Sequence, residues 1–546
     1  AFPRNVGSVS RILKFASRNR IPVTPRGAGH GYVGGCVPLR GGIVLSLERM
    51  KRIKEINPRD FVAVVEPNVV TAELQAAVEK LGLFYPPDPA SRANNSIGGN
   101  IITNAGGPRC LKYGVTRDYV LGLEVVLADG TVVKLGSRTH KNKTGFDLHR
   151  LFVGSEGLLG VVTEATLKLL PLPPFRANLA IGFNSMPAAV RSLHTILDAG
   201  FLPAALELAD AFTLAAAYQR TRSERLRGCR AHLIVELDGQ PRSVRDEIRT
   251  LQRIVSKQKP LFVEVGMGDK QCEAVWQIRR EFSYALRDTG LTKLNQDIVV
   301  PRSRLEDLFK FAARLQKKHN LPIACFGHAG DGNIHSNVMV DGRQPDARRR
   351  SENALDELFR QVLRWGGAIT GEHGIGIAKK RWWPMAVSPA ARQLHAAFDA
   401  ASRLWHSGRE SILAECSPAG GWAKGDHNKA VLMAEQARLV DLCFATAGPT
   451  PESLDALDFF TTTSLAEDTR KDGNTPRHPF FEHCETVGQR RKNFSTALFL
   501  AFLAFSRSEL PRRKQQRKIQ TFDDLLTRLH AALHGAGGIA LASQLR

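Results

Sequence analysis

The stretch PRGAGHGYVGG, residues 25–35, decides the fold, and it holds five glycines in eleven residues directly after the strand-like IPVT. Glycine adopts positive φ without strain and lets backbone N–H groups approach a phosphate with no side chain in the way. One loop of this kind is more often a tight turn than a phosphate cradle. It therefore predicts a pyrophosphate site only where other segments support it.

Four companion segments supply this support, because each adds polar loop residues to the same part of the chain. Core packing does not require so many polar, largely glycine-containing loops in one domain. The arrangement differs from a dinucleotide-binding Rossmann site, which needs one GxGxxG between a strand and a helix with an acidic residue downstream. The segments are PPDPAS (86–91), IGGNIITNAGG (97–107), KYGVTRD (112–118) and GSEGLLGVVTE (154–164).

The hydrophobic pattern predicts an α+β fold. Residues 1–175 alternate short apolar runs, such as FVAVVEP (61–67), with glycine and proline, which is typical of strands joined by turns. The stretches VSRILKFASRN and TAELQAAVEKLG repeat apolar residues every three or four positions and predict helices. From about 176 to 405, longer helical patterns interleave with strands such as RAHLIVELDG, so we predict a second α+β domain there.

Two glycine-rich segments of the second domain, 324–340 and 366–383, concentrate histidine and acidic residues. GHAGDGNIH places His328 and His335 seven positions apart, and GEHGIG adds Glu372 and His373. Two imidazoles and a carboxylate are a familiar ligand set for a divalent metal with open positions. A lone histidine is more often a core residue, but so many polar groups in two loops are hard to bury without partners. The pattern predicts a metal site.

Taken together, these motifs resemble flavoproteins of the vanillyl-alcohol-oxidase superfamily, in the branch of D-lactate dehydrogenase, D-2-hydroxyglutarate dehydrogenase and the flavin-binding component of glycolate oxidase. The resemblance covers about residues 1–400. It implies a two-subdomain, PCMH-type FAD-binding domain over 1–175, then an α+β substrate or cap domain over 176–405 that carries the metal site. The FAD contacts it implies are Pro25, Arg26, Gly27, Ala28, Gly29, His30, Gly31, Gly34, Gly35, Pro89, Gly98, Gly99, Asn100, Asn104, Gly106, Gly107, Tyr113, Gly114, Glu156, Gly157, Gly160 and Val162.

His30 departs from the threonine that is common in these dehydrogenases. Members of the wider superfamily that attach FAD covalently through histidine look similar at this point (RxGGH). Two alternatives stay open: a covalent 8α-histidyl flavin, and a histidine that only hydrogen-bonds the cofactor. We favour the second.

The resemblance implies FAD-dependent oxidation of a D-2-hydroxy acid, of the D-lactate, glycolate or D-2-hydroxyglutarate class, to the 2-oxo acid. It assigns His328, His335 and Glu372 as metal ligands and His373 as the base. The carboxylate and α-hydroxyl of such a substrate chelate one cation, which lowers the pKa of the hydroxyl. His373 then takes this proton while hydride leaves for the flavin. Zinc and manganese are expected first, and iron also accepts this ligand set.

A segment upstream of the metal motifs, residues 275–301, resembles the part of the family that binds the substrate carboxylate. Arg279 is the preferred clamp, because arginine can bind a carboxylate through two hydrogen bonds. Ser283 and Lys293 are weaker candidates, since solvent-facing helix residues would look the same. Asn337, two positions beyond the second histidine ligand, corresponds to a substrate contact.

The net charge of +23 is compatible with three kinds of anionic partner: nucleic acid, an anionic membrane surface or an anionic substrate. The densest basic stretch, PRRKQQRK (511–518), lies far from the motifs, so we attribute the charge to basic tails and do not expect nucleic acid. The eight cysteines include no CxxC pair, which signals neither a disulfide framework nor a metal cluster. Without a cluster to relay electrons, we expect a separate electron acceptor: a quinone, a flavoprotein or a partner subunit.

Two segments of the sequence bear on the cellular location of the protein. The first residues resemble an ordinary helix and strand rather than an export signal. The apolar run ALFLAFLAF (497–505) is far shorter than the roughly 20 residues of a membrane span and predicts a buried helix. We expect a cytoplasmic protein. Two further possibilities stay open: peripheral attachment at the inner membrane of a bacterium, and a homodimer.

The last part of the chain departs from the family. Residues 406–429 lack a clear period and predict a linker, and 430–546 predict a helical tail. Within the tail, HPFFEHCETV (478–487) and a second stretch at 517–535 resemble a fragment of the beta chain of exodeoxyribonuclease V, which is a helicase. The chain has no GxxxxGK[ST] loop, so this mode of ATP hydrolysis is not expected. Two alternatives to an active flavoenzyme therefore stay open: a DNA-processing protein, and an inactive flavin-binding fusion product.

Overall fold

The computed structural model describes residues 1–145, 147–415, 436–437, 440, 456–469 and 475–492. The chain divides into two compact units, of which the first contains Ala1–Ala386 and the second begins at Val387. All residues predicted for the FAD, metal and substrate sites lie in the first unit. No helix among the described residues is long and apolar enough to cross a membrane.

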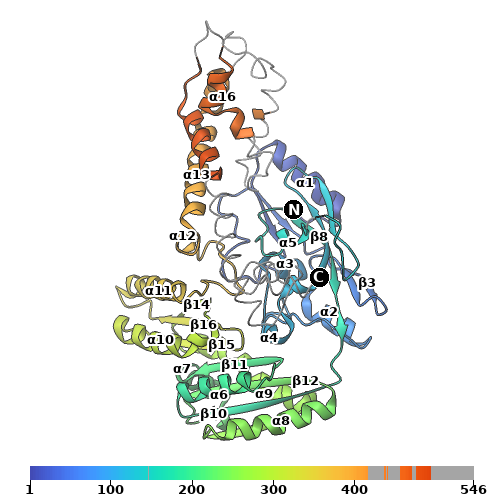
Figure 1. The fold of residues 1–546 in the computed structure, drawn as a ribbon, viewed down its shortest axis with the longest axis vertical. Helices are drawn as coiled ribbons and strands as arrows, with labels where there is room; N and C mark the ends of the chain where they lie inside the picture. Colours follow the sequence, from blue (N-terminus) through green and yellow to red (C-terminus); the bar gives the residue numbers. More distant parts are fainter. Residues whose placement is uncertain (146, 416–435, 438–439, 441–455, 470–474, 493–546) are drawn as a thin grey trace, which may run out of the picture. The chain divides into compact units, whose positions relative to one another are not determined.

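The first part of unit one is built on a five-stranded antiparallel sheet (Figure 1). From Thr163 to Lys168 of β8, buried and partly buried side chains alternate, and the partly buried ones are polar, as expected for a strand packed mainly on one face. Helices α2 and α3 contribute Leu74, Val78 and Ile101 to the core under this sheet. In spatial order the strands are β3 (Ile53–Asn57), β4 (Val62–Val65), β8 (Val161–Lys168), β6 (Val120–Val126) and β7 (Val132–Gly136).

The glycine-rich loop 27–42 joins two short parallel strands beside this sheet. The preceding helix α1 begins after Asn5, whose side chain accepts the N–H of Ser8 at 2.9 Å as an N-cap. Its buried residues Val9 and Leu13 are four positions apart and pack against the core. The remaining elements here are α1 (Val6–Arg18), β1 (Val23–Arg26), β2 (Ile43–Ser46), α2 (Thr71–Glu79), β5 (Leu83–Phe84), α3 (Ile97–Thr103), α4 (Cys110–Tyr113), η1 (Thr116–Tyr119), α5 (His149–Phe152) and β9 (Leu170–Pro171).

The second part of unit one is a seven-stranded antiparallel sheet with helices on both faces. Its order departs from the chain order, so that strands from distant segments become neighbours at the centre. In spatial order the strands are β13 (Phe262–Met267), β10 (Phe175–Phe183), β12 (Ala231–Gly239), β11 (Ala205–Asp210), β15 (Ile323–His328), β16 (Asn333–Val340) and β14 (Thr292–Val299).

Strand alternation decides which side chains of this sheet belong to the core and which to the site. Ile334 and Val338 of β16 point into the large core covered by four helices, whereas Met339 packs with the two helices on the opposite face. His335 shares the odd-numbered positions of Met339, so it lies on this second face. The helices of the large core are α6 (Met186–Asp198), α8 (Pro241–Ser256), α10 (Leu305–His319) and α11 (Ala347–Arg364), and those of the second face are α7 (Ala211–Thr221) and α9 (Gly268–Asp288) (Figure 1).

The predicted α+β class is confirmed. Short 3-10 turns, η2 (Glu224–Leu226) and η3 (Arg302–Arg304), and the short helix α12 (Trp383–Ala386) complete unit one. Unit two contains α13 (Pro389–Glu415), α16 (Thr462–Glu467) and helical residues 479–492, with Phe460, Phe480 and Phe481 in a core of their own.

The expected linker over 406–429 needs correction at its start. Residues 406–415 continue helix α13, which is kinked at Gly408. The irregular composition of this stretch hid a helix that packs Ile412 into the core of unit two. The rest of the expected linker and the segments 497–505, 511–518 and 517–535 lie outside the described residues.

Candidate active site

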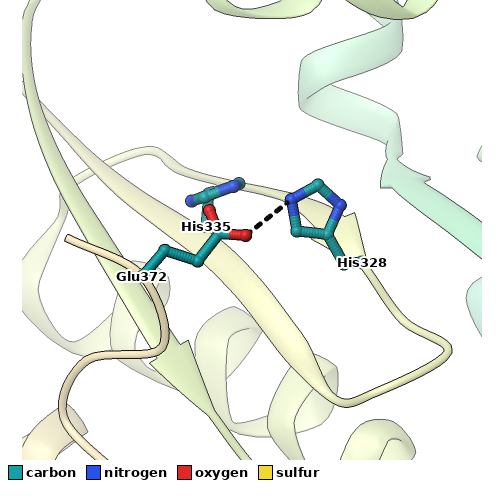
Figure 2. Close-up of side chains that lie close together, drawn as sticks. All are labelled: His328, His335 and Glu372. Carbon is teal, nitrogen blue, oxygen red and sulfur yellow. Dashed lines mark ion pairs between the residues drawn. The ribbon is translucent and has the colours of Figure 1, made fainter. Parts of the chain in front are cut away.

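The three predicted metal ligands come together in the first unit (Figure 2). His328 ends β15, His335 lies in β16, and Glu372 lies in the loop that follows Ile369. One ligand atom from each side chain lies within 4.8 Å of the others. The Nε2 atom of His328 is 3.4 Å from Oε1 of Glu372. A hairpin and a distant loop thus build one donor set.

The chemistry of this donor set fits a divalent metal. Both imidazoles are buried, and Nδ1 of His335 has no hydrogen-bond partner among the described residues. Burial lowers the pKa of His335 to about 3, so this ring is neutral and able to bind a metal. Burial opposes ionisation of Glu372, yet His328 still lowers the pKa of this carboxyl below its usual value. Two imidazoles and an ionised carboxylate suit zinc, manganese or iron.

Asp297 of β14 shapes the loop that carries Glu372 and His373. One of its oxygens, Oδ2, accepts the backbone N–H groups of Gly371, Glu372 and His373 at 3.0, 2.7 and 2.8 Å. The other oxygen pairs with the buried Lys379. Burial opposes ionisation, but His373 and Lys379 hold the pKa of Asp297 well below its usual range. A fully buried carboxylate therefore fixes the backbone next to the metal site.

His373, the predicted base, lies beside the metal ligands. Its ring stacks on that of His335 with centroids 5.5 Å apart, and the ring of Tyr32 lies 4.7 Å away on the glycine-rich loop. Its Nδ1 atom is 3.4 Å from Oδ1 of Asp297. His373 and all three ligands line one cavity. The predicted base and the three-residue donor set are thus next to each other, an arrangement that would suit proton removal from a bound hydroxyl.

This cavity has a volume of about 860 Å³ and is lined by both parts of unit one. The glycines of its wall are sterically required at two points. Gly29 has φ +75°, and a Cβ on Gly27 would lie 2.5 Å from Oγ of Ser96. The predicted FAD contacts that line the cavity are Pro25, Gly27, Ala28, Gly29, His30, Gly31, Gly35, Pro89, Gly99, Asn100, Gly106 and Glu156.

The other predicted FAD contacts do not line the cavity. Some have clear roles in packing: Val162 is a core residue, a Cβ on Gly98 would collide with Pro67, and the hydroxyl of Tyr113 donates to Asp238 at 2.8 Å. For all of the residues outside the wall, the contact with FAD stays a prediction. The full set is Arg26, Gly34, Gly98, Asn104, Gly107, Tyr113, Gly114, Gly157, Gly160 and Val162.

Glu156 joins the two parts of unit one in addition to lining the cavity. Its two carboxylate oxygens accept the backbone N–H groups of Ile375 and Gly376, each at 2.7 Å. The residue has φ +54°, a conformation that costs a non-glycine residue free energy. Its side chain holds the end of the GEHGIG segment against the glycine-rich domain.

Arg279 lines the cavity, as a substrate clamp should, but it already has a partner. Its Nε and Nη2 atoms both lie 2.7 Å from Oε2 of the buried Glu207. The guanidinium also lies 4.8 Å from the ring centroid of Phe326. The contact with Glu207 fixes the Nε and Nη2 edge of the guanidinium and leaves the Nη1 side for a ligand.

The other predicted substrate residues are placed differently. Ser283 lines the cavity and accepts a hydrogen bond from Nζ of Lys293 at 2.6 Å, while Lys293 lies behind it. Burial lowers the pKa of Lys293 to about 8. Asn337 is fully buried, and its amide NH₂ group donates to the carbonyls of Ala324 and His335. It does not line the cavity, and its contact with the substrate stays a prediction. It braces the two ligand strands.

Sequence reasoning missed two acidic residues of this site. Glu207 and Asp297 are almost completely buried and contact His328 and the GEHGIG loop. Glu207 interrupts the apolar run ALELA at the start of β11, in which a carboxylate is hard to bury without a specific partner. That signal could have identified it.

Comparisons with known proteins agree with this architecture. The FAD binding domain model matches residues 1–136, and the model for the C-terminal domain of FAD linked oxidases matches residues 172–404. Glycolate oxidase subunit GlcD of Bacillus subtilis is 40% identical over 401 residues, which are 73% of this chain and 85% of that protein. A D-lactate dehydrogenase of Anaerostipes hadrus is 32% identical, covering 71% of this chain and 83% of its own.

A solved structure of p-cresol methylhydroxylase with bound substrate shares the fold, with a TM-score of 0.60 at 18% identity over 72% of this chain and 84% of that one. The solved structure shows that the fold is shared. The family models and the relatives define a flavin-dependent oxidoreductase. The chain belongs to the FAD-linked oxidases, and the predicted family and FAD cofactor are confirmed. The resemblance of the tail to a helicase fragment stays a prediction.

Proposed function

We propose that this protein oxidises a small D-2-hydroxy acid, of the glycolate, D-lactate or D-2-hydroxyglutarate class, to the 2-oxo acid. One observation carries the proposal: His373 stacks beside the His328, His335 and Glu372 donor set in the cavity lined by the glycine-rich loops. The names of the relatives, a glycolate oxidase component and a D-lactate dehydrogenase, support the same substrate class.

Each part of the site has a task in this reaction. FAD, when bound, supplies the acceptor for the hydride from C2. A divalent cation held by His328, His335 and Glu372 would bind the carboxylate and hydroxyl of the substrate and lower the pKa of the hydroxyl. His373 accepts the hydroxyl proton, and the exposed edge of Arg279 holds the carboxylate. The substrate loses the hydroxyl proton and the hydride of C2, which leaves the C=O group of the 2-oxo acid.

Anaerobic spectroscopy of the purified protein tests the proposal. The flavin spectrum should bleach with D-lactate, glycolate or D-2-hydroxyglutarate and persist with the L enantiomers. Bleaching should fail after chelation and return with Zn²⁺ or Mn²⁺. A protein that binds FAD but is bleached by no member of the panel is the inactive fusion product instead. Steeply salt-dependent DNA binding by a preparation without FAD would favour a DNA-processing protein.

His30 lines the cavity, and its attachment to FAD can be tested separately. We propose that it hydrogen-bonds the cofactor without a covalent link. FAD should then leave the protein on acid precipitation. A yellow pellet in the wild type and a colourless pellet in His30→Thr would instead support a covalent bond at this residue.

We further propose that a separate molecule reoxidises the flavin, since the sequence has no CxxC pair to hold an electron relay. A soluble quinone should therefore reoxidise the substrate-reduced protein faster than oxygen does. Equal rates with both oxidants would contradict a dedicated acceptor.

A further inference from the structure

Glu207 is a buried carboxylate in an otherwise apolar stretch of β11. Its side chain is 1% exposed, and both oxygens have partners. Oε1 lies 2.5 Å from Nδ1 of His328. Oε2 accepts a hydrogen bond from Nε of Arg279 at 2.7 Å and forms an ion pair with Nη2 of the same guanidinium, also at 2.7 Å. One carboxylate thus contacts a predicted metal ligand and a predicted substrate clamp.

The pairing of strands brings Glu207 to His328. These residues are directly opposite each other in the antiparallel ladder of β11 and β15. Opposite residues point to the same face of a sheet, so their side chains meet. A shift of one residue in this register would place Glu207 on the other face. The contact is therefore a property of the sheet rather than of a mobile loop.

The hydrogen bond to Glu207 selects one form of the His328 ring. A carboxylate accepts, so the proton of the neutral imidazole belongs on Nδ1, and Nε2 keeps its lone pair. Nε2 is also the atom that faces Oε1 of Glu372 at 3.4 Å. Metal-binding histidines usually donate their second ring N–H to a carboxylate or carbonyl in this way, which fixes the tautomer and orients the ring.

The other oxygen of Glu207 orients Arg279. The Nε and Nη2 edge of the guanidinium is occupied by this carboxylate, and its centre lies 4.8 Å from the ring centroid of Phe326. A guanidinium has a second edge, Nη1 and Nη2, that binds a carboxylate with two parallel hydrogen bonds. Since Arg279 lines the cavity, this second edge is the one available to a substrate.

We propose that Glu207 is a positioning residue that couples the two halves of the site. It turns Nε2 of His328 toward the metal position and the Nη edge of Arg279 toward the substrate carboxylate. The proposal rests on the proposed function, because it presumes that the donor set binds a metal and that Arg279 binds the substrate. Glu207 itself touches neither of them.

Glu207→Gln tests the proposal in the full chain loaded with FAD. The amide keeps the size of the side chain but loses the charge and presents a donor to one of its two partners. Affinities for Zn²⁺ and Mn²⁺ are measured by competition with a chromophoric chelator. Loss of an outer-shell partner of this kind should weaken metal binding about 10- to 100-fold. At saturating metal, kcat should largely recover while KM for the hydroxy acid stays raised, since Arg279 is no longer held.

Glu236→Gln is the matched control. Glu236 lies in the neighbouring strand β12, is fully buried and pairs with Arg109 and Arg176, and within the described part of the chain no hydrogen bond or ion pair joins it to His328. Its substitution should leave metal affinity within about threefold of the wild type. If Glu207→Gln fails to fold, the double variant Glu207→Gln with Arg279→Met removes the unpaired cation and should show the same loss of metal affinity.

The outcomes separate the two proposals. Wild-type metal affinity in Glu207→Gln, or an equal loss in Glu236→Gln, would overturn the role of Glu207 and leave the metal site intact. A wild-type protein that binds no metal at His328, His335 and Glu372 would instead overturn the proposed function itself.

Discussion

Asp297 accepts the backbone N–H of His373 at 2.8 Å, although the two residues are 76 positions apart in the sequence. The same oxygen accepts the N–H groups of Gly371 and Glu372. A proposed metal ligand and the proposed base are therefore both held by one carboxylate of the sheet.

Asp297→Asn should both destabilise the protein and reduce its activity. Substitution leaves Lys379 buried without its counterion, and breaking a buried ion pair costs roughly 3–5 kcal/mol. We expect a lower melting temperature and a lower kcat. Adding Lys379→Met should recover stability but not kcat, because the three N–H groups still lack an anion. Recovery of both would show that Asp297 serves stability alone.

His373→Gln should slow the chemical step without removing the metal. General base catalysis contributes about 10²- to 10⁴-fold, so flavin reduction measured by anaerobic stopped flow should slow by this factor. Metal content measured on the same sample should remain at the wild-type level. A reduction rate within twofold of the wild type would assign the proton transfer to another group.

KM for the hydroxy acid should depend on pH and begin to increase near pH 8. Burial lowers the pKa of Lys293 to about 8, and its ammonium contacts the cavity residue Ser283. The positive charge that attracts an anionic substrate is present below this pH and is lost above it, so KM should rise as pH increases past about 8. Lys293→Arg keeps its charge, so KM of this variant, measured from initial rates, should not increase above pH 8. The same increase of KM in this variant would assign the pH dependence to a different residue.

Glu156→Gln should weaken the junction between the glycine-rich domain and the GEHGIG segment. One amide oxygen can still accept a single N–H, but the NH₂ group faces the other donor, and one unsatisfied buried N–H costs about 1–3 kcal/mol. We expect a lower melting temperature and weaker FAD retention on gel filtration. Glu224→Gln, at an exposed pair with Arg227, is the control and should change neither. Equal behaviour of the two variants would contradict this role for Glu156.

Motifs in the sequence were sufficient to predict the class of protein, and they named four side chains that the structure brings together. Gly29 is required by positive φ, which is a local backbone property that a glycine in the sequence can indicate, whereas Gly27 is required by the approach of Ser96, which only the tertiary structure shows. His328, His335, Glu372 and His373 stand in two short motifs whose residue types are costly to bury without a function. The alternating and helical patterns likewise predicted the mixed α+β class, because both periods are set locally.

The supporting residues could only be found in the tertiary structure. Glu207 meets His328 because β11 and β15 are paired in one register, and Asp297 meets the GEHGIG loop because β14 lies at the edge of the same sheet. The resemblance implies that Asn337 contacts the substrate, and only the strand geometry shows that its amide also donates to two backbone carbonyls. The sequence by itself thus determined which chemical groups are present. Pairing between distant strands decided which of them touch, because contacts across a sheet depend on register and not on separation along the chain.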